Sequence, residues 1–161
     1  MIIINKSETA DTRTCNYTKV TKDQLLKSSH QHISDVRQGL TFLIGMLVRA
    51  GEKHDHTKIS GIDQFHADFI GGFKSTTWWD NHRKEERHHL AQLDGIPNDV
   101  NLIDVVEFLM DGVMAGLARS GSYRKEIFPH WLLEKAFNNT VDLMLKEVVV
   151  KDSDKQGGAG K

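Results

Sequence analysis

The chain has 161 residues, of which 39% are hydrophobic and 27% charged, which is an ordinary balance for one globular domain. Its 21 basic and 22 acidic residues give a net charge of −1, which argues against duplex DNA or an anionic membrane surface as a partner. No signal peptide is visible, and the longest apolar run is too short to cross a bilayer. Cys15 is the single cysteine and cannot form an internal disulfide, which is typical of a reducing compartment. We therefore expect a cytoplasmic protein.

The N-terminal part predicts an arm followed by a long helix. Residues 1–20 show no clear hydrophobic period, and we expect an extended arm or a short strand there. Thr21 and Gln24 form a capping-box pattern that predicts a helix start. This helix is expected to run to Gly51. Its apolar residues recur every seven positions, at Leu26, Ile33, Leu40 and Leu47.

Three further helices are expected in the middle of the chain. One covers roughly residues 54–69 and ends before Gly71 and Gly72. The next begins near Trp78 and continues to Gly95. After the turn that contains Pro97, an apolar stripe over residues 105–117 predicts another.

The C-terminal part predicts a loop, a last helix and a tail. Residues 119–128 read as the loop, and Pro129 is a typical first-turn residue of a helix that extends to about Val149. Because strand-like alternation is absent, the expected class is all-α: a single-domain helical bundle of about five main helices. The predicted organisation is an arm over 1–20, a helical domain over 21–150 and a disordered tail over 151–161.

Histidines and aspartates recur in a pattern typical of a metal site. Neutral imidazole and carboxylate are ligands of Zn, Mn and Fe, and a single such residue on a helix is usually structural, so only the combination is informative. His82 and His89 are seven residues apart, which places both on one face of a predicted helix. The candidates, in chain order, are His30, His32, His54, Asp55, His82, His88, His89, Asp104 and Asp111.

At these residues the chain resembles the HD-domain superfamily of metal-dependent phosphohydrolases, which are helical bundles. The resemblance implies that His32 is the first ligand, His54 and Asp55 the His-Asp pair, and Asp111 the final aspartate. His82 with His88 or His89 resembles the histidines that two-metal members add, and which of the last two is a ligand stays open.

A second resemblance covers residues 28–122 and concerns a small phage and bacterial family of unknown function. The segment from His54 to Lys58 carries it, together with residues farther along the chain. These are Phe65, Trp78, Trp79, His82, His88, His89, Asp111 and Gly116. The loop that distinguishes the HD-GYP phosphodiesterases is missing, so no cyclic dinucleotide specificity is implied.

The resemblance implies one or two divalent ions (Mn, Fe, Zn, Ni or Mg) and a metal-activated water that attacks a small phosphorylated metabolite such as a nucleotide. Asp55 would bridge two ions, and Lys58 would hold a phosphate or protonate the leaving oxygen. Trp78 has two interpretations, a platform for a nucleobase or a ring buried in the core. Candidate phosphate-binding residues are Arg119, Arg124 and Lys125, and candidate acceptors for the imidazole N–H groups are Glu85, Glu86 and Glu107.

Two other functions fit the same residues. One is a di-iron oxygenase of the HD type, which retained iron and an oxygen-dependent colour change would indicate. The other is a non-catalytic nucleotide-binding or host-interaction protein of phage origin, which would act in the host cytoplasm. A homo-oligomer is compatible with each of these functions.

Overall fold

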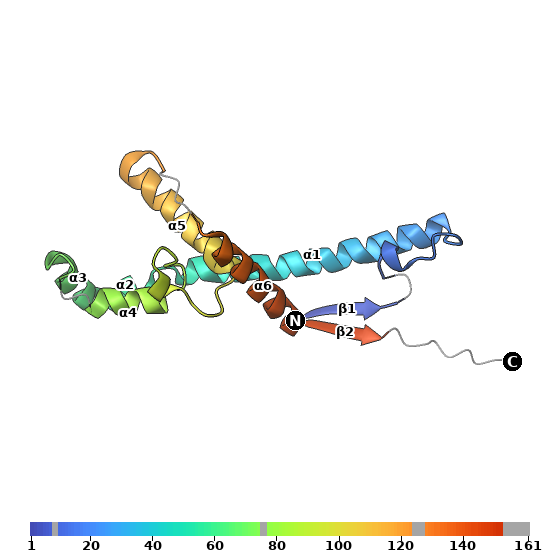
Figure 1. The fold of residues 1–161 in the computed structure, drawn as a ribbon, viewed down its shortest axis with the longest axis horizontal. Coiled ribbons are helices and arrows are strands. Elements are labelled where there is room, and N and C mark those ends of the chain that lie inside the picture. Colours follow the sequence, from blue (N-terminus) through green and yellow to red (C-terminus); the bar gives the residue numbers. More distant parts are fainter. Residues whose placement is uncertain (8–9, 75–76, 124–127, 153–161) are drawn as a thin grey trace. The chain divides into compact units, whose positions relative to one another are not determined.

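The computed structural model describes residues 1–7, 10–74, 77–123 and 128–152. Helices dominate these residues, which confirms the all-α class (Figure 1). The helices are α1 (Lys22–Lys53), α2 (His56–Ser60), α3 (Ile62–Ile70), α4 (Thr77–Glu85), α5 (Leu102–Ser120) and α6 (His130–Glu147). The remaining elements are the strands β1 (Ile2–Lys6) and β2 (Val148–Asp152) and the 3-10 turns Thr12–Thr14 and Leu93–Gly95. None of the described helices has the length and apolar character that crossing a membrane requires.

The chain separates into two compact units. The first consists of Met1–Ile44 with Leu143–Lys161, and the second is Gly45–Asp142. The helical domain that we expected over 21–150 is therefore divided between them, and α1 and α6 each contribute residues to both.

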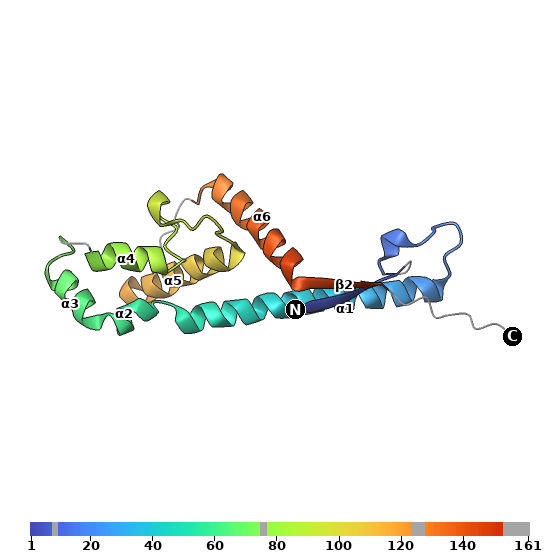
Figure 2. The same ribbon diagram turned by 90° about the horizontal axis from the view of Figure 1, so that it is seen from below.

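The first unit contains a parallel pair of strands that the sequence pattern did not predict in full. β1 and β2 lie side by side, with Ile2 opposite Val148 and Lys6 opposite Asp152 (Figure 2). The expected last helix thus ends at Glu147, and Lys151 and Asp152 belong to β2 rather than to the tail. Three consecutive β-branched valines favour a strand at this point. The rest of the predicted tail lies outside the described residues.

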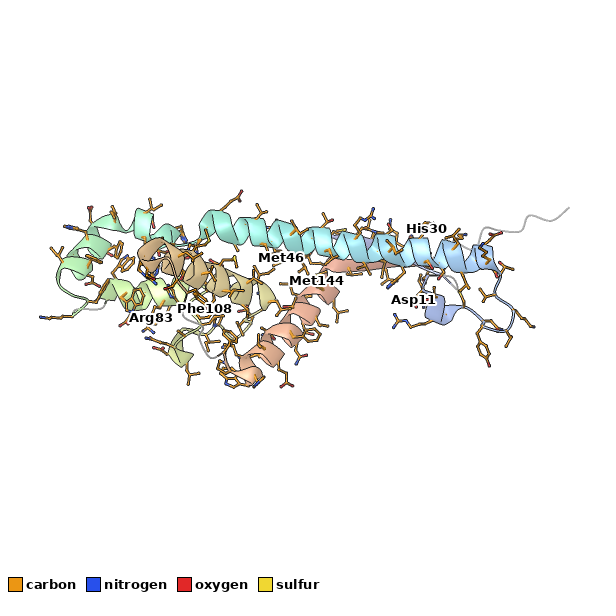
Figure 3. All side chains as sticks on the ribbon, turned by 90° about the horizontal axis from the view of Figure 1, so that it is seen from above. Asp11, His30, Met46, Arg83, Phe108 and Met144 are labelled. Carbon is orange, nitrogen blue, oxygen red and sulfur yellow. The ribbon has the colours of Figure 1, made fainter. Side chains whose placement is uncertain are left out.

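The start of α1 agrees with the predicted capping box. Gln24 N donates to Thr21 Oγ1 at 3.2 Å, and Thr21 N donates to Gln24 Oε1 at 2.9 Å. Before this helix, Asp11 (labelled in Figure 3) accepts hydrogen bonds from Arg13 N and Nε, both at 2.8 Å. α1 continues past the expected end at Gly51 to Lys53.

The second unit has a small core. Leu90, Val100 and Leu132 are buried in it, and partly buried neighbours pack against them, among them Phe108 of α5 (labelled in Figure 3). α5 begins with a capping box in which Asn101 Oδ1 accepts from Ile103 N and the Asp104 carboxylate accepts from Asn101 N. This core lies beside the segment that carries His88 and His89, because Leu90 follows His89 directly.

The expected second helix is two helices, with the break at Gly61. A Cβ at Gly61 would lie 3.0 Å from Trp78 Nε1 and 3.1 Å from Thr57 O, so a larger residue would require these neighbours to shift. α2, α3 and α4 pack on one another.

The expected third helix is shorter than predicted, because α4 ends at Glu85 rather than Gly95. Ion pairs connect this end of α4 and the segment after it to carboxylates elsewhere. The Arg83 guanidinium binds Asp80 and Asp94, each at 3.0 Å, and Arg87 binds Asp104 at 2.8 Å. His88 and His89 therefore lie on an irregular segment and not on a helix face.

Candidate metal centre

Asp55 connects α1 to α2 in an unusual backbone conformation. Its φ of 56° and ψ of 22° are left-handed, a region that few residues other than glycine adopt, although aspartate tolerates it better than most. Such outliers cluster at functional sites. The conformation sets the carboxylate among histidines that come from the turn after α1, from α4 and from the segment after α4.

The carboxylate of Asp55 lies at the centre of this cluster. Its Oδ1 is 3.3 Å from His82 Nε2 and 3.7 Å from His88 Nε2. Its Oδ2 is 3.4 Å from His54 Nε2 and pairs with the Lys58 ammonium. Although Oδ1 and both ring nitrogens of His88 are buried, none of them makes a hydrogen bond of acceptable geometry.

The potential ligand atoms form two groups that share Asp55. One group is His54, Asp55 and His88, the other is Asp55, His82 and His89, and within each group the atoms lie within 4.8 Å of one another. The structure thus brings together five of the nine candidate ligands, with His88 and His89 in different groups. Asp111 lies at the edge of the first group, with Oδ1 3.7 Å from His54 Nε2.

Glu107 orients the two histidines of the first group. Its Oε1 is 2.9 Å from His54 Nδ1 and 3.1 Å from His88 Nδ1. A carboxylate only accepts, so the hydrogen bond to Glu107 is expected to place the proton of a neutral His54 on Nδ1, and the charge of Glu107 favours the same tautomer of His88. The Nε2 lone pairs then face the Asp55 carboxylate. A carboxylate that holds a histidine in this way is a common second partner in metal sites.

A separate chain of hydrogen bonds orients His82. Thr57 N and Oγ1 donate to Glu86 Oε1 at 3.0 and 2.8 Å. Because the hydroxyl proton is used there, Thr57 Oγ1 accepts from His82 Nδ1, 2.5 Å away. His82 Nε2 is left without a proton, and it lies 2.9 Å from His89 Nε2. Glu86, one of the candidate acceptors, is thus buried at 5% exposure, whereas Glu85 is exposed.

Burial and neighbouring charges shift the pKa values of three members of the cluster, Asp55, His88 and His89. Burial opposes ionisation of Asp55, but the Lys58 ammonium and the neighbouring histidines outweigh it and keep the pKa of this carboxyl well below its usual range. Burial and the nearby rings of His88 and His82 lower the pKa of His89 to about 4, so His89 is neutral near pH 7. Burial lowers the pKa of His88, but Glu107 outweighs this and raises it overall.

Trp78 contributes to the core and to the position of His82. It is 6% exposed, and its ring stacks on Phe65 with centroids 4.3 Å apart and on His82 at 4.7 Å. A ring covered in this way has no face for a nucleobase, so of the two interpretations the packing supports the core.

Several predicted residues lie elsewhere. His32 is exposed in the first unit, with Nδ1 3.2 Å from Asp11 Oδ2, about six helical turns before the end of α1. His30 is also exposed on α1.

The remaining candidates lie on or after α5. Asp104 binds Arg87 and caps α5 rather than facing the histidines. Arg119 is exposed near the end of α5, and the predicted phosphate-binding residues Arg124 and Lys125 lie outside the described residues.

The sequence analysis included Thr57 in the segment from His54 to Lys58 but gave it no role. Its contacts with His82 and Glu86 make it part of the centre. Comparison with known proteins adds no further constraint, since no family model, curated protein or solved structure matches the chain.

Proposed function

We propose that this chain is a metal-dependent phosphohydrolase of the HD type, with a two-ion centre built around Asp55. The observation that carries the proposal is the pair of ligand groups that share this carboxylate. Two ions bridged in this way clamp the oxygens of a phosphate ester in many hydrolases.

The residues fit divalent ions on chemical grounds. Buried polar atoms nearly always have a partner, so the unpaired Asp55 Oδ1 and His88 Nε2 call for a bound group, and a cation between them would satisfy both. The donors are imidazoles and carboxylates without a thiolate, a set that suits Zn, Mn, Fe and Ni. His54 and His88 would hold one ion and His82 and His89 the other, with Asp55 between them.

Bound ions would supply Lewis acidity and lower the pKa of a water toward neutrality. The chain's own groups position the reactants. Glu107 and Thr57 fix the ring orientations, so the Nε2 atoms need no reorganisation. Lys58, with 36% of its side chain exposed, pairs with Asp55, and its ammonium could pair with a phosphate oxygen or protonate the leaving alkoxide.

The proposal is tested by metal content and phosphate release. The purified protein is analysed for metals, then stripped with chelator and reloaded with Mn, Fe, Zn, Ni or Mg. We expect about two equivalents of ion and hydrolysis of p-nitrophenyl phosphate or its diester that chelation abolishes and reloading restores. A protein that takes up no ion under any of these conditions would contradict the proposal. Iron that changes colour with oxygen, without phosphate release, would identify the oxygenase instead.

Thr57→Val is expected to weaken the second ion site selectively. The valine keeps the shape of threonine but removes the hydroxyl that accepts from His82 Nδ1, and loss of such an outer partner lowers metal affinity about 10–100-fold. Thr57→Ser retains the hydroxyl and is the matched control. Titration against a competing chelator measures the change, and equal affinities for the valine and serine variants would exclude this role.

A further inference from the structure

An apolar groove opens beside the first ligand group. Its volume is about 370 Å³, within the range of small-molecule sites, and it lies between the end of α1 and α5. The larger apolar side chains along it are Leu47 of α1 and Val106, Met110 and Met114 of α5. All of the residues that line it belong to the second unit.

The groove is continuous with the metal centre. Its three charged or titratable lining residues, His54, Glu107 and Asp111, are all members or neighbours of the first ligand group. On α5 the apolar residues 106, 110 and 114 recur every four positions, and the carboxylates 107 and 111 form the adjacent row. A ligand whose head lies at the centre would therefore extend its body along apolar side chains.

The lining gives a nucleotide little to bind. Among the described residues that line it, none is a Ser, Thr, Asn, Gln, Lys or Arg that could bind a base or a sugar, and none is a Phe, Tyr or Trp for stacking. The small residues Ala50, Gly51 and Ala115 leave space, and the two methionines adapt easily to a flexible chain. The groove is therefore charged at its end near the metal centre and aliphatic along the rest of its length.

We propose that this groove binds the aliphatic chain of a phosphate monoester, whose phosphate lies at the centre around Asp55. The inference rests on the proposed phosphohydrolase function and replaces the nucleotide expected from the sequence with an alkyl-type phosphate. Glu107 and Asp111 would repel the phosphate unless cations were bound, so binding of the head requires the ions, whereas the chain requires only the apolar walls.

Binding of non-hydrolysable alkylphosphonates to the metal-loaded protein tests this directly. Chains of two to ten carbons are titrated by calorimetry. Each added methylene is expected to lower the Kd about three- to fourfold until the groove is filled, with an increasingly negative heat-capacity change. Met110→Gln, which places a polar group in the groove, should reduce the effect of each methylene. Met46→Gln is the matched control, because Met46 of α1 does not line this groove.

The outcomes separate this inference from the proposed function. Hydrolysis of p-nitrophenyl phosphate, with phosphonate affinity independent of chain length, would keep the hydrolase and overturn the groove. Chain-length-dependent binding without any hydrolysis would support the groove and contradict the hydrolase. Tighter binding of nucleoside monophosphates than of octylphosphonate would overturn the inference. The inference would also be overturned if the Kd did not depend on chain length and Met110→Gln changed the mass of the protein in solution. A second copy of the chain would then occupy the groove.

Discussion

Asp55→Asn is expected to strip both ions from the protein and to lower the rate of phosphate release by at least about 10³-fold, because bound ions contribute several kcal/mol to such reactions. Asp55 is the one residue that the two ligand groups share. Asparagine preserves the size of the side chain and tolerates the left-handed backbone at this position, so the change removes charge without adding strain.

Elemental analysis and a phosphate-release assay on the same preparations measure the effect. Asp63→Asn makes the same chemical change at an exposed position of α3 and is the matched control. Circular dichroism verifies that both variants remain helical. An Asp55→Asn protein that keeps two ions would show that the carboxylate does not bridge them, and one that keeps a single ion would restrict Asp55 to one group.

Leu132→Ala is expected to destabilise the second unit by about 2–5 kcal/mol, which is the usual cost of replacing a fully buried leucine with alanine. Leu132 has no exposed surface and packs with Leu90 and Val100, in a core that contains few other buried apolar residues. The corresponding decrease in melting temperature is about 5–15 °C for a chain of this size.

Denaturant unfolding of the metal-free protein measures this cost without the contribution of bound ions. Leu133→Ala, at a neighbouring position that is 40% exposed, should cost about 1 kcal/mol or less. A stability loss as small as that of the control would mean that Leu132 does not anchor the core. Because Leu90 directly follows His89, we also expect Leu132→Ala to weaken metal binding by loosening that segment.

The all-α class and the sites at which helices begin follow from short-range rules. The capping box at Thr21, the apolar stripe of α5 and the start of α6 after Pro129 each depend on residues within a few positions, and the structure has all three. Residue type and order likewise gave a list of candidate ligands that contains His54, Asp55, His82, His88 and His89, because metals select donors by their chemistry. The same list contains His30, His32 and Asp104, which the structure places elsewhere.

Long-range contacts decided the rest. Helical periodicity extended the third helix to Gly95, whereas α4 ends at Glu85. Arg83 and Arg87 pair with distant carboxylates near this end, and His88 and His89 belong to separate groups. The role of Thr57 depends on Glu86 and His82 across the fold, and the burial of Trp78 depends on Gly61 and Phe65. His32 is a histidine like the ligands of the cluster, but it belongs to the first unit, where it pairs with Asp11. Residue type and spacing determine which groups can bind a metal, and only the packing of separate segments determines which of them meet.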